Sequence, residues 1–84
     1  MVKVYVKEAH VISVKPKVTK VVLQYVIVTE NELGMVETIW VDADKFDKEK
    51  VELAIKQRHA ARLGIPSKDI HVEWLIEIPK IRKV

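Results

Sequence analysis

The stretch Val21-Val22-Leu23-Gln24-Tyr25-Val26-Ile27-Val28 decides the fold of this chain, because it is apolar at almost every position. Successive side chains of a strand point to opposite faces, so this strand presents apolar side chains on both faces. Such strands normally lie inside a sheet that is covered on each side. The sequence contains one recognisable helix, which can cover one face only. Something else must cover the other.

Strands are also predicted on both sides of this stretch. Residues 2–14 begin with valine alternating with lysine or tyrosine, the period of a half-buried strand. Lys15-Pro16-Lys17 predicts a turn, since proline fixes its own φ and has no N–H to donate. The central strand then covers residues 18–30, and a loop at residues 31–34 leads into a third strand over residues 35–43.

The first strand is too long for a compact domain of this size. Thirteen residues at roughly 3.3 Å each span about 43 Å, whereas the expected domain diameter is about 30 Å. The alternation of residues 2–14 loses its phase at Glu8-Ala9-His10. We therefore expect a bulge or bend there, and a first hairpin that bends or protrudes.

One helix is predicted over residues 47–63. Asp47 can cap its first turn, and Phe46 and Val51 occupy the two positions of a hydrophobic staple. Gly64 with Pro66 behind it is typical of a helix end.

A last strand is predicted over residues 70–78, which alternate strictly up to Pro79. The alternation places Trp74 on the buried face and Glu73 and Glu77 on the exposed face. The order β-β-β-α-β predicts one α+β domain over residues 1–84, with a mostly antiparallel twisted sheet, a long N-terminal hairpin, one helix on one face, and a basic tail at residues 80–84.

Composition restricts the classes of function. The 84 residues include no cysteine, which excludes disulfides and thiolate metal sites. No apolar run approaches the roughly 20 residues of a membrane span, and the alternating start does not resemble a signal peptide, so we expect a cytoplasmic protein without membrane contact. One asparagine and two glutamines among many lysines, glutamates and valines follow the bias of hyperthermophile proteins.

No pattern predicts catalysis or a cofactor. The three histidines lack the close spacing of metal ligands, and two glycines cannot form a phosphate-binding loop. Asp42 and Asp44 close the third strand, but acids are also favoured at the start of a helix. His71, Glu73 and Glu77 share one face of the last strand, where a solvated face explains them. We expect no enzyme activity, metal, cofactor or small-molecule ligand.

Nucleic-acid binding is one alternative function. The net charge is +4 over residues 1–29, −5 over residues 30–54 and +4 over residues 55–84. Basic side chains on the first strand, the second half of the helix and the tail could neutralise phosphates. The candidates are Lys3, Lys7, Arg58, Arg62, Arg82 and Lys83.

Self-association is the function that the sequence favours. If the odd-numbered residues of the central strand meet the helix, the even-numbered ones form an apolar patch on the other face, and such patches typically mark partner sites. We expect a homo-oligomer, most simply a two-fold dimer. A long hairpin folded back over the sheet would cover the same residues. The candidates are Val22, Val26, Val28, Val36 and Trp40.

Overall fold

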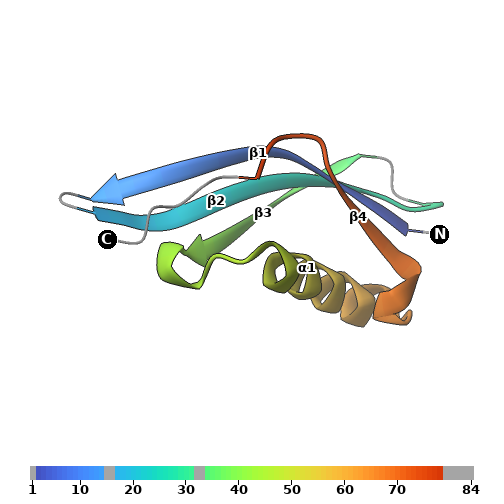
Figure 1. Cartoon of the computed structure of the whole chain (residues 1–84). Helices are drawn as coiled ribbons and strands as arrows, with labels where there is room; N and C mark the ends of the chain where they lie inside the picture. Colours follow the sequence, from blue (N-terminus) through green and yellow to red (C-terminus); the bar gives the residue numbers. More distant parts are fainter. Residues whose placement is uncertain (1, 15–16, 32–33, 79–84) are drawn as a thin grey trace.

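The computed structural model describes residues 2–14, 17–31 and 34–78 and confirms a small α+β fold (Figure 1). The elements follow in the order β1 (Val2–Val14), β2 (Lys17–Val28), β3 (Met35–Asp42), the 3-10 turn η1 (Ala43–Lys45), α1 (Lys48–Leu63), the 3-10 turn η2 (Ser67–Asp69) and β4 (Ile70–Trp74).

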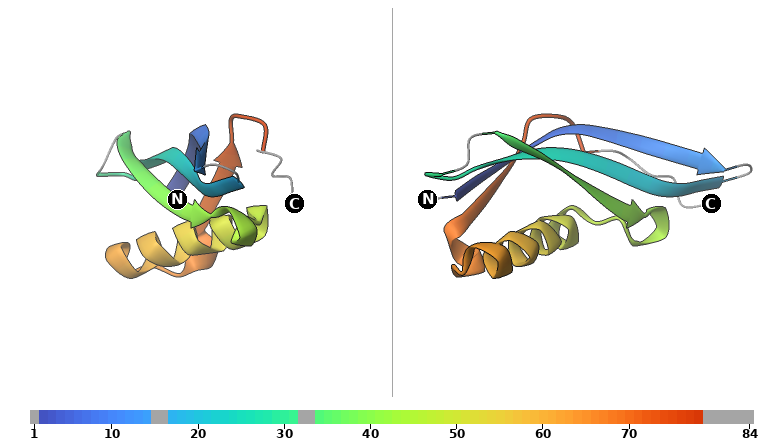
Figure 2. Two further views of the ribbon diagram at one scale, coloured as in Figure 1. Left: turned by 90° about the vertical axis from the view of Figure 1, so that its left-hand side faces the viewer. Right: turned by 180° about the vertical axis from the view of Figure 1, so that it is seen from behind.

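The four strands form one sheet in the order β3-β2-β1-β4. The first three strands are antiparallel neighbours, whereas β4 pairs with β1 in parallel. The last connection is thus a crossover through α1, which lies on one face of the sheet (Figure 2). The opposite face carries no helix within the described residues, and we call it the open face.

The core lies between the sheet and α1, and every strand contributes to it, β2 with the most residues. The odd-numbered side chains of β2, from Val21 to Ile27, are fully buried. On α1 the buried residues are Val51, Ile55 and His59, which recur every four positions and so form one narrow stripe. Burial of the β2 side chains under a single helix therefore accounts for the centre of this domain.

A β-bulge divides β1 into two parts. Val6 pairs with Tyr25, but Glu8 already pairs with Gln24, so Lys7 is the extra residue. The structure thus has the predicted bulge, but at Lys7, one residue before the predicted segment 8–10, whose residues pair regularly with β2. Beyond it the hairpin extends past the first turn of α1, and the molecule measures 44 × 20 × 18 Å (Figure 1). The expectation that this hairpin bends or protrudes is also confirmed.

The last strand is shorter than the sequence pattern predicts. β4 ends at Trp74, which pairs with Val6, and one further bond joins the Leu75 N–H to the Val6 carbonyl. The bulge at Lys7 follows at once, and a neighbouring strand cannot keep its register across such a bulge. Residues 75–78, which the sequence pattern assigned to this strand, are described and lie outside any strand, whereas Pro79 itself is not described.

Trp74 is half-buried rather than buried, which corrects the expectation from the alternation. Its ring packs against the edge of the core, and its Nε1 donates a hydrogen bond of 2.7 Å to Oε1 of Glu52 on α1. Glu73 and Glu77 are exposed as expected. The indole therefore ties the short edge strand to the helix.

The helix boundaries agree with the prediction. One carboxylate oxygen of Asp47 accepts hydrogen bonds from the backbone N–H groups of Glu49, at 2.9 Å, and Lys50, at 3.2 Å. At the other end Gly64 adopts φ 68°, a left-handed conformation that glycine adopts without strain.

We expect Asp47→Ala to lower the free energy of unfolding by about 1 kcal/mol, because two N–H groups of the first helical turn lose their acceptor. Urea unfolding followed by far-UV circular dichroism measures the change. Asp44→Ala is the matched control, since this exposed aspartate in η1 makes no capping bond. Equal losses in both variants would contradict the capping role of Asp47.

Candidate interaction surface and buried polar cluster

The strand register determines which side chains share the open face. Paired residues point to the same side of a sheet, so the even-numbered residues of β2 share a face with their partners on β1 and β3. The open face comprises Lys3, Tyr5, Glu8 and His10 of β1, Val22, Gln24, Val26 and Val28 of β2, Val36, Thr38 and Trp40 of β3, and His71 and Glu73 of β4.

The five residues proposed for self-association all lie on this face, but they differ in exposure. Val22 is only 8% exposed, because it is covered within the single chain, and Val26 and Val28 are half-buried. Val36 and Trp40 are 66% and 60% exposed. We call Val36, Trp40 and the half-buried Val26 and Val28 the β3 patch.

The β3 patch lies at the margin of the sheet. Val36 pairs with Val26 and Trp40 pairs with Val22, so each exposed side chain stands beside a less exposed valine of β2. Next to Trp40, the ammonium group of Lys20 forms an ion pair with the Asp42 carboxylate and donates a hydrogen bond to it. This hydrogen bond holds the pKa of the Asp42 carboxyl below its usual range. Val36 and Trp40 are thus exposed to solvent beside charged side chains of both signs.

A buried polar cluster lies on the other side of the sheet, between β2 and α1. The Tyr25 hydroxyl is 2.7 Å from Nε2 of His59, and the two rings meet edge-on with centroids 5.5 Å apart. Both residues are almost completely buried. The Arg62 Nε–H donates to Nδ1 of His59 at 3.3 Å, which leaves the imidazole proton on Nε2, facing the Tyr25 oxygen.

Arg58 links this cluster to the edge of the sheet. Its Nη1 donates to the Tyr25 hydroxyl at 3.3 Å and to the carbonyl of Thr38 at 3.2 Å. Burial raises the pKa of the Tyr25 hydroxyl, and the hydrogen bond from Arg58 opposes that rise. Since the tyrosine and histidine are buried and bonded to each other, the cluster holds β2, α1 and β3 together and offers no accessible reactive group.

The sequence pattern did not indicate this cluster or the burial of His59. Its spacing of four residues from Ile55 and eight from Val51 was the available signal, because that spacing places all three on one helical stripe. Identifying the partner required the fold, since Tyr25 is 34 residues away.

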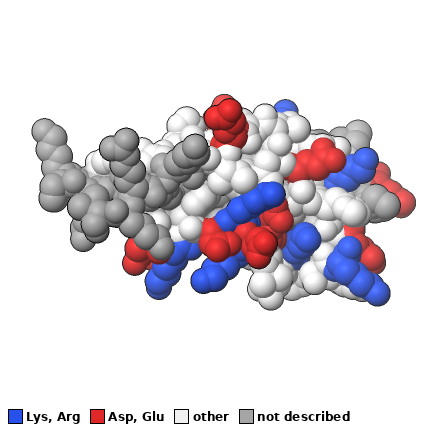
Figure 3. Space-filling view, viewed as in Figure 1, with Lys and Arg blue, Asp and Glu red and all other residues white. Residues whose placement is uncertain are grey.

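The four described residues among those proposed for nucleic-acid binding, Lys3, Lys7, Arg58 and Arg62, do not form one basic surface. Arg58 and Arg62 make the internal bonds described above, while Lys3 lies on the open face and Lys7 in the bulge. Figure 3 shows acidic and basic side chains interleaved on the face that it displays. Arg82 and Lys83 lie outside the described residues. Nucleic-acid binding therefore stays a prediction from composition.

The remaining observations add no site of a known class. Within residues 2–14, 17–31 and 34–78, no three His, Asp or Glu side chains are grouped so as to hold a metal ion. In the same part of the chain, no helix is both long and apolar enough to cross a membrane. No protein-family model, curated protein or solved structure matches the chain.

Tyr25→Phe should lower the free energy of unfolding at pH 7 by about 1 to 3 kcal/mol, because the buried Nε2–H of His59 and one Arg58 N–H lose their acceptor. Urea unfolding at pH 7 measures the loss. Tyr5→Phe is the control, because it removes a tyrosine hydroxyl on the open face, where Tyr5 is half-buried. It should change the free energy of unfolding by less than about 0.5 kcal/mol.

The same tyrosine should make stability depend on alkaline pH. Its pKa is raised above the ordinary value of 10.0, so the unfolded chain loses this proton first as pH increases. Its contribution to stability should be complete below pH 10 and should decline above it. Urea unfolding between pH 8 and 11 should show a steeper decline for the unmodified protein than for Tyr25→Phe. Parallel curves would contradict the raised pKa.

Proposed function

We propose that this protein is a non-enzymatic interaction module that self-associates through the β3 patch of its open face. The observation that carries the proposal is the exposure of Trp40 and Val36 on one face of one edge strand. Contiguous exposed apolar patches are uncommon on monomeric proteins and typically mark partner sites. Tryptophan is also enriched among the residues that contribute most to binding at protein interfaces.

A second copy of the chain suits this patch because the patch is self-complementary about Thr38. Val36 and Trp40 lie two residues on either side of Thr38. A two-fold axis that lies in the plane of contact and crosses β3 at Thr38 places Trp40 of each copy against Val36 of the other. Such an isologous contact closes on itself and yields a dimer. Charges of both signs also border it, since Lys20 and Asp42 lie beside Trp40 and Lys3 lies opposite Val28, so identical surfaces can form complementary pairs.

Contact through the face is favoured over strand pairing along the β3 edge. An exposed edge strand offers unpaired backbone groups to another chain. Arg58 already donates to the carbonyl of Thr38, at the middle of β3. Edge pairing centred there would have to displace the guanidinium, whereas packing of the Trp40 and Val36 side chains leaves its bond intact.

Association would also compensate for the small size of the domain. A chain of 84 residues buries a modest fraction of its surface on its own. Covering the open face adds apolar burial, and the apparent stability then increases with protein concentration. This benefit fits the proposed setting, a cytoplasmic protein of a thermophile, which the Lys- and Glu-rich composition supports.

Trp40→Lys should convert the dimer to a monomer, because the variant places an unpaired charge in the contact. The fold should persist, since Trp40 is mostly exposed in the single chain. Sedimentation equilibrium at micromolar concentrations measures the mass, and far-UV circular dichroism checks the fold. Leu53→Lys is the matched control, because Leu53 is an apolar residue of α1 with 50% exposure.

A monomeric mass for the unmodified protein at these concentrations would overturn the proposal, and so would equal dissociation of both variants. A titration with random-sequence duplex DNA at several salt concentrations examines the alternative function. Tight binding that weakens steeply with salt, together with a monomeric mass, would replace self-association by nucleic-acid binding.

A further inference from the structure

A second feature lies at the end of the core where β1 begins and α1 ends. It borders one end of the β3 patch, since Val28 directly precedes Thr29 of its lining. An open cavity of about 600 Å³ is lined there by β1, the residues that follow β2, the end of α1, η2 and the start of β4. This volume is within the range of pockets that hold small molecules. We call it the end cavity.

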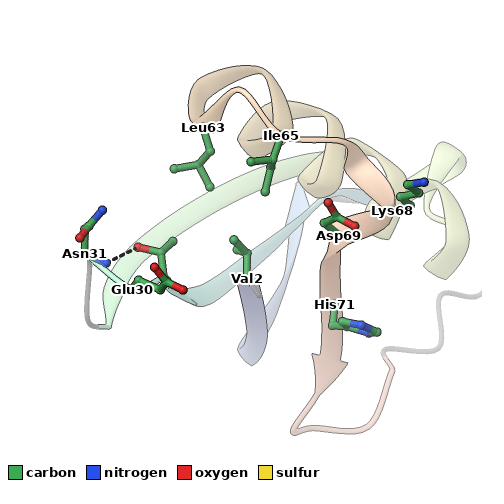
Figure 4. A pocket seen from close by; sticks show the side chains of 9 residues that line it. Val2, Glu30, Asn31, Leu63, Ile65, Lys68, Asp69 and His71 are labelled. Carbon is green, nitrogen blue, oxygen red and sulfur yellow. Dashed lines mark hydrogen bonds between the residues drawn. The ribbon is translucent and has the colours of Figure 1, made fainter.

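The walls of the end cavity are apolar on two sides. Leu63 and Ile65 project from the end of the helix toward Val2, which rises from the sheet below them (Figure 4). Gly64 causes this arrangement, because its left-handed conformation reverses the chain and returns Ile65 to the same side as Leu63. A ligand placed there would have an apolar body between the helix end and the sheet.

Two carboxylates stand beside these walls. Figure 4 shows Glu30, after β2, and Asp69, in η2, on either side of Val2. Neither carboxylate has an ion pair or side-chain hydrogen bond with any residue in the described part of the chain. Lys68 also lines the cavity, but its ammonium group is turned away from both acids (Figure 4).

The lining therefore combines apolar walls with two acids and one lysine, which leaves a net negative charge. Glu30 and Asp69 are both exposed, and an exposed carboxylate favours a cation that can pair with it. A ligand with only apolar atoms would leave both acids without a partner, and an anionic ligand would be repelled by them.

We propose that the end cavity binds an organic amine, a ligand with an alkyl body between Val2, Leu63 and Ile65 and an ammonium group that pairs with one of the two carboxylates, Glu30 or Asp69. The inference is independent of self-association, since none of these residues lies in the β3 patch. The sequence pattern indicated no small-molecule ligand, because the lining comes from segments that are up to 69 positions apart, from Val2 to His71.

The test is a titration of the isotope-labelled, full-length protein at pH 7, followed by backbone amide NMR. The probes are n-hexylamine, n-hexanol and hexanoate, which share one alkyl chain and differ in charge. Hexylamine should shift the amides of residues 29–31 and 63–71 to saturation. It should bind at least about tenfold more tightly than hexanol or hexanoate, as expected for hydrogen bonds to charged groups.

Variants assign the charge effect to the two acids. Glu30→Gln combined with Asp69→Asn should weaken hexylamine binding by about tenfold, while Asp44→Asn, an exposed acid in η1 at the other end of the helix layer, should leave it unchanged. Both acids of the cavity are exposed side chains, so the fold should persist, which the amide spectrum itself reports.

Three outcomes would overturn the proposal. Equal affinities for the three probes would show an apolar contact without charge selection. Saturating shifts located elsewhere would show another site, and absence of shifts up to the solubility limit of the amine would show no site. Repetition with Trp40→Lys keeps this test separate from self-association, since the amine should bind that variant equally well.

Discussion

The structure depends on the burial of one side of β2 under a single helix. Val21, Leu23, Tyr25 and Ile27 are fully excluded from solvent, and the strands on both sides are positioned by pairing with β2. Because side chains alternate along a strand, fixing this side also fixes which residues of β1 and β3 face away from α1. The open face is thus a direct consequence of the core.

The buried bond between Tyr25 and His59 gives this packing its specificity. Apolar side chains would tolerate several registers of α1 on the sheet, since burial is not directional. A buried hydroxyl and a buried imidazole must meet, because either one alone would lose its hydrogen bond to water. Arg58 and Arg62 complete the arrangement with hydrogen bonds to Tyr25 and His59.

The bulge at Lys7 divides the molecule into two regions with different surroundings. Before it, β1 lies between β2 and β4 and is covered by the helix layer, whereas beyond it the hairpin extends past α1. β4 pairs with β1 only up to this point. One inserted residue thus sets the length of the last strand and the half-buried position of Trp74.

The sequence by itself determined the element types and the ends of the helix, because these depend on local signals: the alternation of β1, the Asp47 cap and the Gly64 stop. It did not determine which of the two apolar faces of β2 lies against the helix. The structure places the odd-numbered residues there and leaves the even-numbered face open. The exposure of individual residues on that face required the fold, since Val22 is covered by neighbours whereas Trp40, its partner on the edge strand, is not. The parallel pairing of β4 beside β1, the Tyr25–His59 bond and the end cavity likewise join segments that are far apart in the chain. Periodicity reports how one segment divides its side chains between two faces, but only tertiary packing decides which segments meet.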